Sequence, residues 1–180
     1  RAADDLPVED RVNLDPPAIA GPGSNLSFAL LNNDSTRCLL HPSGHIVSIN
    51  NANHKIEALK LPPAALPDSV VAQYHLARTY SGVGTQPGLI MYPVGLAISP
   101  DGVILVLEAG PWNNRIQAFD LGGNPVPYFK NQDPPYYLEL PATSNGTYLD
   151  LAVEFSGYLY VMSTNASNAH RLDIYHPLQR

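Results

Sequence analysis

Polar and charged residues stand at matched positions in two of three similar segments of this sequence, and their types could support chemistry. Arg37 and Asp150 occupy one such position. His41 and Glu154 occupy another, four residues further along each segment. Guanidinium, carboxylate and imidazole groups that converge can bind a polar ligand or a divalent metal ion. They converge only if the three segments meet in space, and otherwise they are charged strand ends in contact with solvent.

A second candidate is the pair of histidines in His41-Pro-Ser-Gly-His45. Two histidines four residues apart bind one metal ion when a helix brings them to the same face. The intervening Pro-Ser-Gly predicts a turn instead of a helix, so we expect solvated turn histidines here. The pair Gly82-Val-Gly84 is not a dinucleotide fingerprint, because the third glycine and the surrounding βαβ unit are missing.

Trp112 is the candidate for partner binding. It follows Pro111 in a predicted connector between two strands, where a large apolar side chain can anchor a protein partner. The same side chain can equally pack over the edge of a neighbouring sheet. Both interpretations stay open at this point.

Composition indicates a globular all-β chain. Of the 180 residues, 44% are apolar and 14% charged, which argues against a disordered chain or a charged coiled coil. The 18 prolines and 13 glycines are typical of short strands joined by tight turns. The net charge of −6 disfavours nucleic acid as a partner. No stretch is long and apolar enough to predict a membrane span.

The single cysteine does not indicate a cellular compartment. Cys38 has no second cysteine to pair with, and its place in the run Cys38-Leu39-Leu40 predicts a buried thiol. Asn-x-Ser/Thr sequons begin at Asn25, Asn33, Asn145 and Asn165, more than chance predicts from 14 Asn and 18 Ser or Thr. This excess favours a secreted or cell-surface protein.

An internal repeat must position these residues. Three segments contain a short apolar run, a glycine and a second apolar run, and the glycines are Gly44, Gly102 and Gly157. Each copy therefore predicts a β-hairpin. A third run alternates apolar and polar residues, as a half-buried strand does. These runs are Lys55–Leu59, Arg115–Phe119 and Arg171–Tyr175.

Weaker signals predict a fourth strand at Tyr74–Thr79 and at Tyr136–Leu140, and none after Tyr175. Leu26–Leu31 is a strand without its own hairpin and could be the outer strand of a neighbouring or terminal sheet. Pro-rich residues 61–68 predict a loop. Residues 1–24 predict an extended leader.

The middle copy, Tyr92–Ala109 followed by Asn113–Asp120, resembles the NHL repeat, and Ser81–Gly88 is similar to the Gly-rich approach of that family. The resemblance covers about residues 81–129 closely. It implies four-stranded antiparallel blades that pack radially around a central axis, as in a β-propeller. It also places Arg37, His41, Asp150 and Glu154 at axial strand ends.

The resemblance has two departures. The copies are 55 to 58 residues apart, which is longer than is usual in the family. The position at the end of the second strand, where the family often has Asp, carries Asn50, Glu108 and Ser163. We therefore divide residues 25–180 into a partial propeller with blades at about 32–80, 92–140 and 147–180. Three blades do not close a ring, so a fragment or a half-ring that dimerises is expected.

The sequence predicts a non-enzymatic propeller module that binds a protein or glycan partner within a larger NHL-repeat protein, with no cofactor. The alternative is a propeller hydrolase or lyase similar to the gluconolactonase-like or amidating-lyase families. A divalent metal would then lie on the axis, with Asp150, Glu154 and His41 as the available ligands. A third interpretation is a structural segment of a repetitive surface protein.

Overall fold

The computed structural model describes residues 35–50, 53–60, 75–80, 83–111, 113–129, 135–143 and 146–175. These ranges contain eleven strands and no helix. The strands are β1 (Ser35–Leu40), β2 (His45–Asn50), β3 (Lys55–Lys60), β4 (His75–Tyr80), β5 (Pro93–Ile98), β6 (Ile104–Gly110), β7 (Asn113–Phe119), β8 (Tyr137–Glu139), β9 (Tyr148–Val153), β10 (Leu159–Thr164) and β11 (His170–Tyr175).

Four sequence predictions fall outside these ranges. They concern the leader 1–24, the strand Leu26–Leu31, the loop 61–68 and Trp112. Among the residues that are described, no helix has the length and hydrophobicity needed to cross a membrane.

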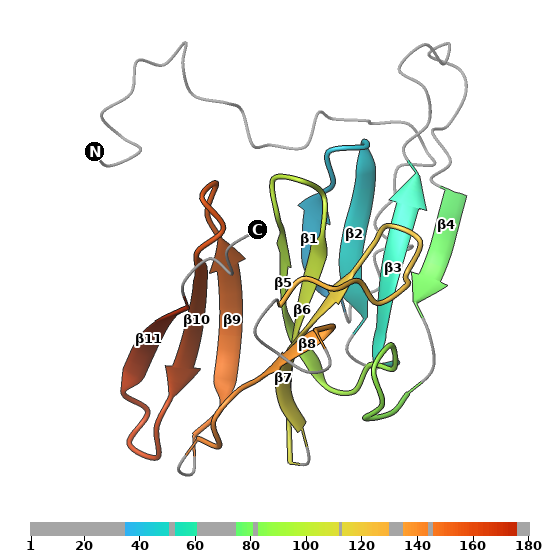
Figure 1. The fold of residues 1–180 in the computed structure, drawn as a ribbon. Coiled ribbons are helices and arrows are strands. Elements are labelled where there is room, and N and C mark those ends of the chain that lie inside the picture. The colour runs from blue at the N-terminus through green and yellow to red at the C-terminus, as the bar shows by residue number, and fades with distance from the viewer. Residues whose placement is uncertain are drawn as a thin grey trace, which may run out of the picture.

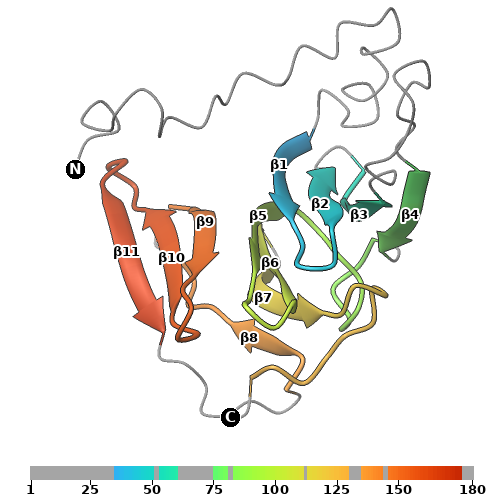
Figure 2. The same cartoon turned by 90° about the horizontal axis from the view of Figure 1, so that it is seen from above.

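The strands form three antiparallel sheets, and each sheet is built from one continuous stretch of chain. The strand orders are β1-β2-β3-β4, β5-β6-β7-β8 and β9-β10-β11. The sheets fan out from one side of the molecule, with β1, β5 and β9 as their innermost strands (Figures 1 and 2). Among these innermost strands, β5 contacts both β1 and β9. The predicted all-β fold of three antiparallel sheets is confirmed.

The glycines that define the repeat form the same turn in all three sheets. Gly44, Gly102 and Gly157 have φ angles of +82°, +85° and +93°, in the left-handed region that glycine adopts without strain. Their N–H groups donate to the carbonyl oxygens three residues earlier, at distances of 2.8, 2.8 and 2.9 Å. The shared register predicted from the glycines is therefore confirmed.

The sheets also share their strand pairing in detail. In each sheet the register slips at the start of the innermost strand, opposite Asn50, Glu108 and Ser163. These three residues pair in turn with Lys55, Arg115 and Arg171 on the next strand. Residues can consequently be matched one to one between sheets.

The hydrophobic core lies between the sheets because both faces of the middle sheet are covered. Ile104, Val106 and Phe119 pack toward the first sheet in one cluster with Val47 and Ile49. On the opposite face, Leu105, Leu107 and Ala118 pack with Leu151, Leu159 and Val161 of the third sheet. Side chains alternate between faces along a strand, so β5, β6 and β7 of the middle sheet each contribute to both clusters.

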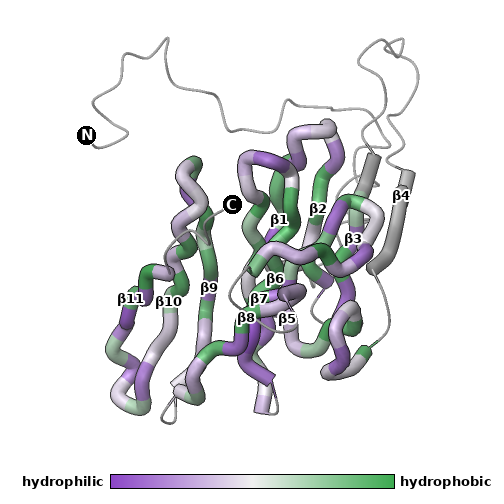
Figure 3. The backbone as a smooth tube through the Cα atoms, viewed as in Figure 1, coloured by the Kyte–Doolittle hydropathy of each residue, from purple (hydrophilic) through white to green (hydrophobic). Residues whose placement is uncertain are grey.

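The third sheet has one face that no described residue covers. Leu172 and Ile174 lie on this face, with 59% and 56% of their surfaces exposed. Their cross-strand partners on β10 are Met162 and Tyr160. Along β11 these apolar residues alternate with hydrophilic ones (Figure 3). The predicted fourth strands correspond to β4 and β8, whereas the third sheet has three strands within the described residues.

The buried thiol predicted at Cys38 is wrong, because this cysteine is exposed. Its neighbour Leu39 packs against the cluster between the first and middle sheets. Alternation along β1 then turns Cys38 to the opposite face of the sheet. The apolar run around Cys38 indicated a strand but not which face each residue would take.

Candidate functional site

The axial position predicted from the repeat brings Arg37 and Asp150 together. Arg37 lies on β1 and Asp150 on β9, and their side chains form an ion pair that joins the first sheet to the third. The matched residue of β5 is Gly95, where an added Cβ would lie 2.9 Å from Leu151 Cδ2 and 3.1 Å from the Leu151 N. Without a side chain at Gly95, β5 and β9 approach closely. Asp150 Oδ1 also accepts a hydrogen bond from the Leu151 N–H at 2.7 Å.

His41 lies apart from this ion pair and has a structural role. Its Nδ1 accepts a hydrogen bond from the Ser43 N–H at 3.1 Å, so the ring proton is on Nε2. Nε2 then donates to the Gly102 carbonyl, 2.8 Å away in the turn of the middle sheet. Only 8% of His41 is exposed. The predicted solvated turn histidine is therefore wrong at this position, because the neighbouring turn covers the ring.

Glu154 is exposed and makes local contacts only. Its carboxylate accepts hydrogen bonds from Ser156 and, at 2.9 Å, from the Tyr160 hydroxyl. The hydrogen bond to Glu154 raises the pKa of Tyr160 above its ordinary value. The structure thus pairs two of the four axial candidates and leaves His41 and Glu154 in separate turns. Among the described residues, no three His, Cys, Asp or Glu side chains are grouped as metal ligands.

A buried polar cluster in the middle sheet was missed at the sequence level. Glu108, Arg115 and Gln117 are buried, and Glu108 Oε2 lies 2.6 Å from Arg115 Nε and 2.7 Å from Gln117 Nε2. Burial raises the pKa of Glu108, and hydrogen bonding and charge from Arg115 oppose this shift. The available signal was the carboxylate at a position where the resembled family often has Asp.

This cluster holds the preceding segment of backbone, Thr85 to Met91, against the sheet. Arg115 donates to the carbonyl oxygens of Thr85, Gln86 and Leu89, and the last of these distances is 2.9 Å. The segment's own N–H groups donate back, from Gly88 to Gln117 Oε1 at 3.0 Å and from Met91 to Glu108 Oε1 at 2.6 Å. The hydrogen-bonding groups of the cluster are therefore satisfied within the protein, and its role is to hold this segment in place.

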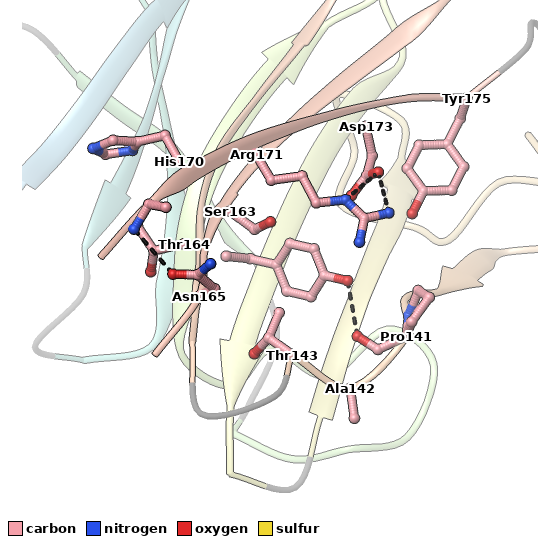
Figure 4. A pocket seen from close by; sticks show the side chains of 12 residues that line it. Pro141, Ala142, Thr143, Ser163, Thr164, Asn165, His170, Arg171, Asp173 and Tyr175 are labelled. Atoms are coloured by element: carbon pink, nitrogen blue, oxygen red, sulfur yellow. Dashed lines mark hydrogen bonds and ion pairs between the residues drawn. The ribbon is translucent and has the colours of Figure 1, made fainter. Parts of the chain in front are cut away.

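A pocket of about 280 Å³ lies beside the third sheet (Figure 4). Residues from the segment before β9 line it together with residues of β9, β10 and β11. They are Pro141, Ala142, Thr143, Tyr148, Ser163, Thr164, Asn165, Ala169, His170, Arg171, Asp173 and Tyr175. No sequence motif pointed to this site.

The pocket contains an ion pair and two tyrosines. Arg171 Nε and Nη2 lie 2.8 and 2.6 Å from the same oxygen, Asp173 Oδ1. The Tyr148 hydroxyl donates to the Pro141 carbonyl at 2.8 Å. Burial, with the neighbouring Tyr175 and Asp173, raises the pKa of Tyr148 to about 12, and burial raises that of Tyr175 as well. Both hydroxyls therefore remain protonated donors at neutral pH.

Known structures resemble this chain in fold. The β-propeller domain of Swd1 (Cps50) from Myceliophteria thermophila matches with a TM-score of 0.52 and 15% identity, over 78% of this chain and 39% of that one. A protein from Lactobacillus plantarum matches with a TM-score of 0.46 and 15% identity, over 79% and 40%. A gluconolactonase from Xanthomonas campestris matches with a TM-score of 0.35 and 14% identity, over 81% and 63%.

The chain thus spans about two fifths of the length of the first two structures. No protein-family model matches the sequence, and no curated protein matches it. Similarity at 15% identity bears on the fold alone. Together with the radial arrangement of the sheets, it identifies them as blades of a β-propeller that do not close a ring within the described residues.

Proposed function

We propose that this chain is a non-enzymatic binding module within a larger propeller protein of the NHL type. The observation that carries the proposal is the contrast between the axial residues and the pocket. Arg37, His41 and Asp150 are engaged in contacts between sheets. The pocket beside the third sheet is instead an open hollow with polar and aromatic lining, as ligand sites are.

The NHL resemblance of the middle blade and the exposed apolar face of the third blade support membership of a larger assembly. Leu172 and Ile174 would be covered if a further blade or a second copy of the chain packed against β11. Trp112, outside the described residues, remains a proposed anchor for a partner. A secreted or cell-surface location is likewise a proposal, and it rests on the four sequons.

Metal analysis tests the proposal against the hydrolase or lyase alternative. The purified chain should contain no stoichiometric divalent ion after dialysis against buffer containing zinc, calcium or manganese. One bound ion per chain that disappears in Asp150→Ala, but not in the exposed control Glu139→Ala, would overturn the proposal in favour of an axial metal site. Circular dichroism of both variants verifies that the sheets are retained.

A further inference from the structure

The pocket of the third blade occupies the same place as a filled site in the middle blade. Ser163, Arg171 and Asp173 match Glu108, Arg115 and Gln117 in the shared strand pairing. In the middle blade these positions hold the backbone of Thr85 to Met91. In the third blade the same positions line the hollow.

The difference follows from the lengths of the two connecting segments. Residues 81–92 join β4 to β5, which gives a connector of twelve residues, whereas residues 140–147 join β8 to β9 with only eight. The longer connector folds back over its sheet. The shorter one contributes Pro141, Ala142 and Thr143 to the rim of the pocket. The space that backbone fills in the middle blade is therefore left open in the third.

We propose that this pocket binds a short peptide segment from a partner protein, chiefly through the peptide backbone. The inference rests on the proposed binding function and names the chemical class of the ligand. It is carried by the match to the middle blade, where the equivalent side chains already recognise backbone carbonyl and N–H groups.

The groups in the pocket suit such a ligand. Arg171 uses Nε and Nη2 for Asp173 Oδ1, which leaves Nη1 as a donor and Asp173 Oδ2 as an acceptor. A peptide unit offers one carbonyl acceptor and one N–H donor, so it can satisfy both. The ion pair carries no net charge, which favours a neutral ligand over a phosphate or a carboxylate.

Exposure and size agree with this assignment. The Arg171 side chain is 74% exposed, so it is accessible to a ligand, whereas Arg115 is buried under its own backbone segment. A volume of about 280 Å³ is just below the range of about 300–1,000 Å³ for small-molecule sites and accommodates a few atoms of backbone with one side chain. Tyr148 and Tyr175 supply flat surfaces for apolar or proline contacts.

A synthetic peptide copying Thr85–Met91, acetylated and amidated at its ends, is the probe. The peptide is titrated into the full chain, and the titration is monitored by calorimetry and by amide chemical shifts. Saturable binding is expected. Arg171→Met should weaken the affinity at least tenfold, and Asp173→Asn should weaken it as well. Phe155→Ser is the control, because Phe155 is 91% exposed in the turn between β9 and β10 and does not line the pocket, and the affinity of this variant should be unchanged.

The proposal is overturned if the peptide does not bind or if Arg171→Met binds it as tightly as the unmodified chain. It is also overturned if glucose, galactose or N-acetylglucosamine binds in the pocket and the peptide does not, because the site would then recognise glycans. These outcomes would overturn the peptide proposal alone. The binding-module proposal fails by a different result, namely a stoichiometric metal ion that is lost in Asp150→Ala.

Discussion

Matched arginines of two blades form ion pairs in different environments. Arg115 and Glu108 form a buried ion pair whose remaining hydrogen-bonding groups are satisfied by backbone. Arg171, at the matched position of the third blade, forms an exposed pair with Asp173. A buried charge without its partner is costly, whereas an exposed pair contributes little. The two arginines therefore form a natural comparison.

Arg115→Met should destabilise the fold by about 3–5 kcal/mol, because it leaves Glu108 buried without a counter-ion and removes the arginine hydrogen bonds that hold the carbonyl groups of Thr85, Gln86 and Leu89. Arg171→Met, the matched control, should change the stability by less than about 0.5 kcal/mol. Urea unfolding followed by circular dichroism measures both. Equal effects of the two substitutions would contradict the structural role assigned to Arg115.

The stability should also depend on pH through Glu108. Its pKa is raised in the folded state, so the folded state retains the proton over a range in which the unfolded chain releases it. The contribution of this group is therefore complete below pH 4.5 and is lost as the pH rises through the folded pKa. Arg115→Met removes the cation that opposes the shift, so the folded pKa rises further and the loss should extend to higher pH. Unfolding free energies from pH 4 to 8 test this expectation, and parallel pH profiles would contradict it.

At the scale of strands and turns, much of the fold could be predicted because glycine positions and alternating runs are local signals. The hairpins around Gly44, Gly102 and Gly157 have the predicted register. The meeting of Arg37 and Asp150 was also anticipated from matched positions, although their proposed ligand-binding role is untested. The burial of His41 and the pocket could not be predicted, because both depend on how a turn or connector of one blade lies against another.

Alanine substitutions at Gly44 and Gly102 distinguish the cost of backbone strain in a turn from the cost of disturbing a contact between blades. Gly44 and Gly102 have nearly equal positive φ angles, so alanine is strained at either. An added Cβ meets no atom within 4 Å at Gly44 but lies 3.0 Å from His41 Nε2 at Gly102. Gly44→Ala should cost about 1–2 kcal/mol, and Gly102→Ala should cost more. Thermal unfolding compares them, and equal losses would mean that the His41 contact adds nothing.

At the scale of the whole molecule, the main feature is that the three described blades do not close a ring. The middle blade is covered on both faces, whereas the third exposes Leu172 and Ile174 beside Tyr160 and Met162. Exposed apolar faces of this kind promote association. A second copy that closes the ring would bury this face, and so would further blades of a longer protein.

The isolated 180-residue chain should therefore self-associate, with a mass of at least twice its 19.5 kDa. Leu172→Lys combined with Ile174→Lys should shift the mass to that of the monomer, because lysines on the open face oppose its burial. Light scattering after size-exclusion chromatography measures the mass. A control with Glu139→Lys on β8 should behave as the unmodified chain does, and a monomeric unmodified chain at high concentration would contradict the prediction.

Each blade is also one uninterrupted stretch of polypeptide, in which no strand is borrowed from another described blade. A pulling force applied to the two ends of the chain would therefore load the blades in series. Contacts such as His41 with Gly102 and Arg37 with Asp150 would break before a blade is unravelled. The molecule should consequently lengthen in separate steps, one blade at a time.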